Sequence, residues 1–302
     1  MQENNCAIFF IFTAVGMDFL YVLYNFQNGI LLPKEQKMNL KNMIGLGVAG
    51  NFAYHLEQAG EIKDFENITT EQPDAPKGIF PFYIPYCDTF LGVYPEGTDT
   101  LYLPEHEANA QMEPEIAILF DIIYGDDDTV ADLIAQKFTT FNDCTIRKAG
   151  AKKISEKKNW GVNSKGIGDK WIAIDRFEKG GIMDRYHICS FVVREGILHT
   201  YGVDAPLLGY SYFYDKLKLW LIDKLNRQKD FGPLEDMAGH LKASGYPDQA
   251  FISIGATAYA EFGEKNYLKS NDEIYVIAYD TYKDRGDMQK SESKIILHQK
   301  VQ

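Results

Sequence analysis

Two acidic segments of this chain carry the residue types that bind metal ions. Glu113-Pro114-Glu115 opens the apolar run 116–120, and Asp143 ends a second apolar segment. Residues two apart on an extended chain point to the same face, so a strand here would project both glutamates to one side. If the fold brings Asp143 beside them, three hard oxygen ligands would suit Mg²⁺, Mn²⁺ or Ca²⁺ and leave room for water or substrate. An isolated Glu-x-Glu pair is more often a solvated strand end.

Other segments whose residues could take part in catalysis or binding occur around these carboxylates in a definite order. Before the acidic pair comes 45–55, which reads Gly-Leu-Gly-Val-Ala-Gly-Asn-Phe-Ala-Tyr-His. After it come Asn142-Asp143 with Arg147, then Trp160 and Lys165, and then the segments 247–255 and 268–276. From about Met43 to Tyr279 this order resembles the fumarylacetoacetate hydrolase superfamily. The matching motifs are a Gly-x-Asn-Tyr-like segment followed by His, Glu-x-Glu, Asn-Asp-x-x-x-Arg, an active-site Lys, and a late Gly-Asp-x-Ile-x-x-Gly-Thr segment.

The resemblance implies a role for each charged residue of the site. It makes Glu113, Glu115 and Asp143 the metal ligands. Arg147 would hold Asp143 or a nearby loop carboxylate in place, although an ordinary surface ion pair is an equal alternative.

The same resemblance implies an active-site lysine. Lys165 would bind a substrate carboxylate or enolate oxygen beside the metal. Because the stretch that follows it is shorter than is usual in the superfamily, Lys158 is the alternative for this role.

His55 is the candidate general base, because an imidazole can accept a proton from water near neutral pH. In the superfamily this histidine pairs with a glutamate three residues later, whereas this chain has Gln58 there. A glutamine can orient the imidazole but cannot stabilise its charged form. We therefore expect metal-centred chemistry such as decarboxylation to survive the change better than hydrolysis. The alternative is that His55 only packs against the preceding loop.

These residues together imply a divalent-metal-dependent enzyme. It would act on a small 2-oxo acid or 1,3-dicarbonyl, through C–C cleavage or decarboxylation with a metal-stabilised enolate. An isomerase or hydratase on the same fold, or a non-catalytic metabolite-binding protein, are the alternatives. We expect a cytoplasmic homodimer.

The pattern of elements favours an α+β fold, consistent with the superfamily's mixed β-sandwich or β-roll with a few flanking helices, because strands and helices do not alternate strictly. Apolar residues at three-to-four spacing predict an amphipathic helix over 129–138. Other expected helices cover 51–59, 214–225 and 234–241. The expected strands are 171–174, 187–193, 197–201, 251–259 and 273–279, with a hairpin turn at 194–196.

Composition limits the remaining possibilities. The chain has 302 residues and a formal net charge of −12, without a basic stripe, so nucleic acid is not an expected partner. Its four cysteines show neither zinc spacing nor close pairing. We expect a catalytic domain over 38–302 that does not enter the membrane. The apolar segment 1–37 is interpreted as an extension from a misplaced start, with a membrane anchor as the rival interpretation.

Overall fold

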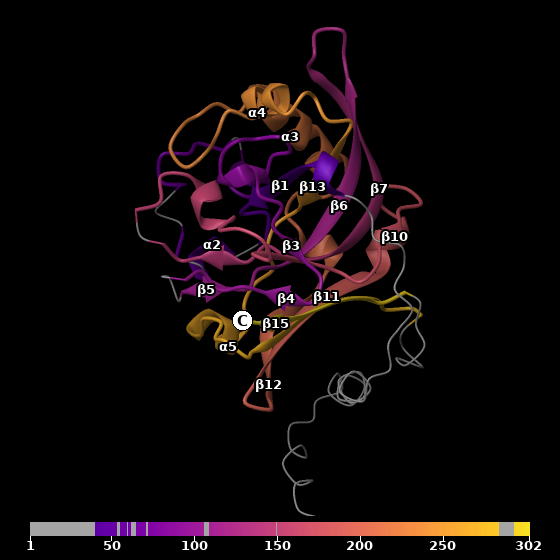
Figure 1. Ribbon diagram of the computed structural model, residues 1–302. Coiled ribbons are helices and arrows are strands. Elements are labelled where there is room, and N and C mark those ends of the chain that lie inside the picture. The colour runs from indigo at the N-terminus through magenta and orange to yellow at the C-terminus, as the bar shows by residue number, and fades with distance from the viewer. Residues whose placement is uncertain are drawn as a thin grey trace, which may run out of the picture.

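Two stacked β-sheets form the body of the protein in this computed structural model (Figure 1). The structure describes residues 40–302 except 53–54, 59, 62–64, 71, 106–108, 149 and 284–292, and the side chains of residues 55 and 56 are not described. The predicted extension 1–37 therefore lies outside the described residues. The larger sheet has the strand order β2-β1-β13-β6-β7-β9-β3, with β10 beside β7. The smaller sheet has the order β12-β11-β14-β15-β4, and β5 pairs with β8 apart from both.

The strands vary from two to thirteen residues in length. Their bounds are β1 Ile44–Ala49, β2 Gly78–Tyr83, β3 Glu96–Gly97, β4 Thr100–Leu101, β5 Ala110–Gln111, β6 Pro114–Tyr124, β7 Val130–Asn142, β8 Thr145–Ile146, β9 Lys165–Ile167, β10 Ile172–Ala173, β11 Tyr186–Arg194, β12 Ile197–Pro206, β13 Gln249–Ser253, β14 Glu273–Asp280 and β15 Ile295–Val301.

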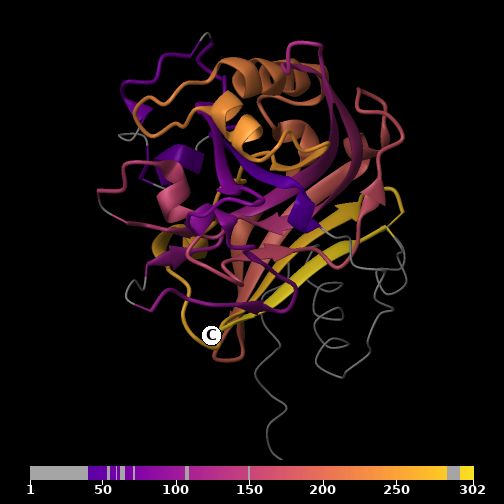
Figure 2. The ribbon, with the colours of Figure 1, turned by 45° about the horizontal axis from the view of Figure 1, so that its top comes forward.

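The helices are short apart from α3 and lie around the sheets. They are α2 His55–Gln58, α3 Tyr214–Arg227, α4 Met237–Ala243 and α5 Glu261–Lys265. Figures 1 and 2 show α3 and α4 together at one end, with α5 near β12 at the other. The main core lies between the sheets and also takes in the apolar stripe of α3, which consists of Leu217, Leu221 and Leu225.

The helix predicted for 129–138 is wrong, because this segment belongs to the β6–β7 hairpin. Residues 130–142 form β7, which pairs with β6 along its whole length. The register shifts at two places, which leaves Ala131 and Gln136 as extra residues opposite β6. Each such bulge moves the buried face by one position. Val130, Leu133 and Phe138 thereby reach the same core with a spacing that imitates a helix.

Most other predicted elements are confirmed. The strands at 187–193 and 197–201 form a hairpin whose turn residues Glu195 and Gly196 both have positive φ. The helix at 214–225 is α3, and 273–279 lies within β14. Of the predicted helix 51–59, residues 55–58 form α2, whereas residues 53, 54 and 59 lie outside the described part of the chain. The predicted strand 251–259 ends at Ser253. None of the helices in the described part of the chain combines the length and apolar character that crossing a membrane requires.

Candidate metal centre

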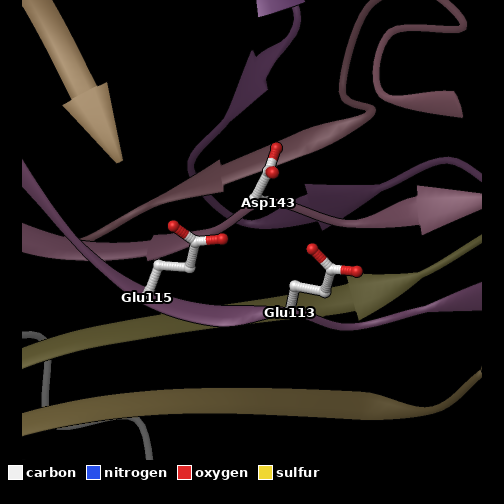
Figure 3. A group of neighbouring side chains, drawn as sticks. All are labelled: Glu113, Glu115 and Asp143. Atoms are coloured by element: carbon white, nitrogen blue, oxygen red, sulfur yellow. The ribbon is translucent and has the colours of Figure 1, made fainter. Parts of the chain in front are cut away.

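Three buried carboxylates meet where β6 begins and β7 ends. Glu113 immediately precedes β6, Glu115 is its second residue, and Asp143 immediately follows β7. One carboxylate oxygen from each lies within 4.8 Å of the other two, and their side chains face a common space (Figure 3). No more than 3% of the surface of any of the three is exposed. The sequence pattern thus assembles in space as a compact set of oxygen donors.

The hairpin register fixes this arrangement. Pro114 lies opposite Asn142, so the residues on either side of this pair are held together across the two strands. The Asp143 backbone N–H donates to the Glu113 carbonyl oxygen at 3.0 Å. The Asn142 side-chain oxygen accepts from the Glu113 N–H at 3.3 Å. Glu113 and Asp143 are therefore positioned by main-chain pairing rather than by flexible loops.

Two buried lysines reach the carboxylates. Lys158 donates to Glu113 Oε2 at 2.5 Å and to Asp143 Oδ2 at 2.6 Å. Lys165 lies 2.8 Å from the other Asp143 oxygen and also donates to the Cys144 carbonyl. Both lysines proposed for the active site are thus present at the same carboxylate.

Burial and neighbouring charges act differently on these groups. Burial raises the pKa of Glu115 well above its usual value, and the nearby Asp143 charge adds to this effect. Burial also lowers the pKa of Lys165, an effect that the Asp143 charge only partly offsets. For Lys158, burial would lower the pKa, but the charges of Asp143 and Glu113 outweigh it and raise the pKa. The cluster therefore stabilises positive charge most strongly between Glu113 and Asp143.

Arg147 connects Glu113 to a loop carboxylate. Its guanidinium lies 3.0 Å from Glu113 Oε1 and 2.7 Å from Glu61 Oε1. It also donates to Gln111 Oε1 at 2.8 Å and to the Tyr259 hydroxyl at 3.1 Å. The Arg147 side chain is only 10% exposed, so this is an internal network rather than a surface ion pair. Of the two expected kinds of partner, Asp143 or a nearby loop carboxylate, the arginine contacts the loop carboxylate Glu61, and it also contacts Glu113.

Glu115 is oriented by the end of β13. Its Oε2 accepts the Gly255 backbone N–H at 2.8 Å. Gly255 has φ of +115°, and a Cβ there would lie 2.9 Å from the Cβ of Asn51. The Asn51 amide in turn binds the backbone of Ile254 and Tyr212. Asn51, the asparagine of the Gly-x-Asn-Tyr-like segment, therefore fixes the backbone that holds Glu115.

The predicted general base can be placed only in part. His55 begins α2, but its side chain is not described. Gln58, at the end of the same helix, donates to the Tyr259 carbonyl at 3.1 Å and accepts the Tyr259 N–H at 2.8 Å. Both ends of this amide are thus bound to backbone. The role of His55 stays a prediction.

The model of a family of unknown function, DUF5718, matches residues 61–300. The chain belongs to this family. No curated protein sequence matches it.

Solved structures show which fold this DUF5718 protein has. Cg1458, solved with an inhibitor, is similar with a TM-score of 0.51 and 14% identity, over 85% of this chain and 76% of that one. A protein from Oleispira antarctica, proposed to be a fumarylacetoacetate isomerase/hydrolase, has a TM-score of 0.50 and 12% identity, over 86% of this chain and 93% of its own. The expected α+β fold of the fumarylacetoacetate hydrolase type is confirmed.

Several residues around the carboxylate cluster of this DUF5718 protein could not be assigned a role from the sequence. Glu61, Gln111 and Tyr259 all reach Arg147 from distant parts of the chain, and no motif marks them. Lys157, which contacts Glu61, lies in a lysine-rich segment that also contains Lys152 and Lys153, so its place in the network carries no sequence signal either.

Proposed function

We propose that the protein is an enzyme acting on a small 2-oxo acid or 1,3-dicarbonyl compound, with a divalent metal ion held by Glu113, Glu115 and Asp143. The observation that carries this proposal is the convergence of three buried carboxylates within 4.8 Å. Buried carboxylates repel one another and keep their charges only beside cations. A cluster placed by strand pairing, and not by chance contacts of loops, is suited to binding.

The donor set fits a hard divalent cation. All three ligands are carboxylate oxygens, which Mg²⁺ and Mn²⁺ prefer, and Ca²⁺ accepts the same donors. When bound, such an ion would polarise a chelated carbonyl and stabilise negative charge that develops on its oxygen. Glu115, whose pKa is raised by burial and by Asp143, gains most from a cation at this place.

The cations around the centre would bind the substrate or orient a metal ligand. The Lys165 ammonium contacts Asp143 Oδ1 and the Cys144 carbonyl, and these two contacts fix its position beside the centre. An ammonium has three donors, so one remains that can bind a substrate carboxylate or an enolate oxygen. Arg147 would hold Glu113 in its orientation through the contact at 3.0 Å.

The arrangement around α2 favours decarboxylation or another enolate reaction over hydrolysis. Hydrolysis needs a base whose positive charge is stabilised after it takes a proton from water. Gln58 is neutral and is bound at both ends to the Tyr259 backbone, so it cannot supply that charge. Of the described acids near it in sequence, Glu57 is exposed and Glu61 is already paired with Arg147 and Lys157. Cleavage through a stabilised enolate requires no such base.

A cleft lies beside the segment that carries Lys158, although its lining includes Glu105 and Glu156 and none of the three carboxylates. It has a volume of about 400 Å³ and is lined in part by Ile146, Asn159 and Trp160. Asn159 follows Lys158 directly, and the Trp160 ring lies 5.7 Å from the Lys165 ammonium. We propose this cleft as the direction from which substrate approaches.

Calorimetric titration of Mn²⁺ and Mg²⁺ into the full chain tests the proposal. One saturable site is expected, which is lost in Glu115→Gln and kept in Glu235→Gln, a matched change at a buried carboxylate elsewhere. Oxaloacetate and acylpyruvates then separate decarboxylation from hydrolysis. Binding without turnover of any oxo acid would indicate a metabolite-binding protein, and folded protein without metal binding would refute the metal centre.

A further inference from the structure

The Lys158 ammonium lies between two of the three carboxylates that are proposed as metal ligands. It lies 2.5 Å from Glu113 Oε2 and 2.6 Å from Asp143 Oδ2. One nitrogen thus bridges two carboxylates that begin and end different strands. The side chain is only 4% exposed, and its ammonium lies 5.1 Å from the centre of the Phe80 ring. Water therefore contributes little to the balance of charge at this place.

The backbone around Lys158 is held firmly. The Lys158 N–H donates to the Ser155 carbonyl at 3.0 Å. The side chain of the next residue, Asn159, donates to the backbone carbonyls of Phe82 and Val93 at 2.8 and 2.9 Å. The ammonium consequently reaches the carboxylates from a fixed base, and only rotation of its own side chain can withdraw it.

Cations of the chain already lie at two of the three carboxylates. Arg147 and Lys158 contact Glu113, and Lys158 and Lys165 contact Asp143. A divalent ion added to this set would lie within a few ångströms of the Lys158 ammonium. Like charges at such a separation in a buried site repel strongly.

We infer that Lys158 is an internal counter-ion of the carboxylate centre, which a divalent metal ion must displace from Glu113 and Asp143 in order to bind. The inference rests on the proposed metal centre. It adds that the centre is stable in two states, one closed by the lysine and one occupied by metal. Metal affinity in the natural chain is therefore lowered by the free energy of the lysine contacts.

Mn²⁺ affinity and thermal stability of Lys158→Met and Lys157→Met test this inference. Both variants lose one positive charge from the same segment, and the described ion pair of Lys157 is with Glu61 at 2.9 Å. We expect Lys158→Met to bind Mn²⁺ about tenfold or more tightly than the natural chain. It should also unfold at a lower temperature without metal and gain more from Mn²⁺. Lys157→Met should stay within about threefold of the natural affinity.

The outcomes separate this inference from the proposed function. If the natural chain binds Mn²⁺ and Lys158→Met binds no more tightly, the inference is wrong and the metal centre stands. If only Lys158→Met binds, the inference holds and the natural chain does not use a metal. If neither binds while both are folded, both proposals fail. Should Lys158→Met not fold, Lys158→Gln provides the same comparison, and Lys158→Arg, which keeps the charge, should not gain affinity.

Discussion

The Gln58 amide binds both backbone groups of Tyr259, donating to its carbonyl at 3.1 Å and accepting its N–H at 2.8 Å. The same tyrosine accepts a hydrogen bond from Arg147 through its hydroxyl. Gln58 thus attaches α2 to the network that orients Glu113. A glutamate at this position would lose the donor and place its charge against a carbonyl. The residue acts here as an anchor, for which a neutral amide is required.

Gln58→Glu should destabilise the protein by about 1–3 kcal/mol, because a half-buried carboxylate oxygen would face the Tyr259 carbonyl without a donor between them. Urea unfolding at pH 7.5 measures this loss. Gln302→Glu, at an exposed position, serves as the control and should change stability by less than about 0.5 kcal/mol. An unchanged free energy of unfolding in Gln58→Glu would show that the anchor is dispensable.

Arg147→Met should cost about 3–5 kcal/mol of unfolding free energy, because Glu61 and Glu113 would lose a buried partner. The matched surface change is Arg227→Met, whose side chain is 82% exposed and should cost about 0–1 kcal/mol. Denaturant titration of both variants compares them. Equal losses in the two variants would contradict an internal role for Arg147.

Gly255→Ala should reduce both stability and Mn²⁺ affinity. The new Cβ would approach Asn51 to 2.9 Å and shift the backbone N–H that binds Glu115. Gly245→Ala is the matched control, since Gly245 also has positive φ but has open space around the added Cβ. We expect a loss of about 1 kcal/mol in the control and a larger loss in Gly255→Ala. If Mn²⁺ binding is weakened equally in both, Gly255 does not position Glu115.

Glu235 should make stability depend on pH. Burial raises the pKa of this carboxyl from 4.5 to about 7 in the folded protein. Between these two values the folded state holds a proton that the unfolded state releases, so stability falls as the pH rises through this window. Glu235→Gln removes this contribution. Relative to the natural chain, the variant should gain up to about 3 kcal/mol between pH 4.5 and pH 8, measured by urea unfolding at each pH. A difference that is constant with pH would contradict the raised pKa.

Sequence patterns indicated the residues of the centre but not their contacts. The spacing of Glu113 and Glu115 was sufficient to place both on one face, because strand geometry has a fixed period of two. The bridging position of Lys158 depends on where the turn before it lies in space, and the sequence carries no signal for that. The Gln58–Tyr259 contact joins residues 201 positions apart, so local patterns could not indicate it. The failure to predict the strand at 130–142 has a local cause, since its two bulges interrupt the two-residue alternation of buried side chains.

Those bulges have a consequence for how the length of this strand can vary. Ala131 and Gln136 are the extra residues of β7 opposite β6. Deleting either one would straighten the pairing and leave every other side chain on its present face. A deletion at any other position of β7 would move each residue beyond it to the opposite face of the sheet, and Asp143 would then point away from Glu113. Relatives that keep this centre can therefore differ in length by one residue at Ala131 or Gln136, and elsewhere in the strand only by two.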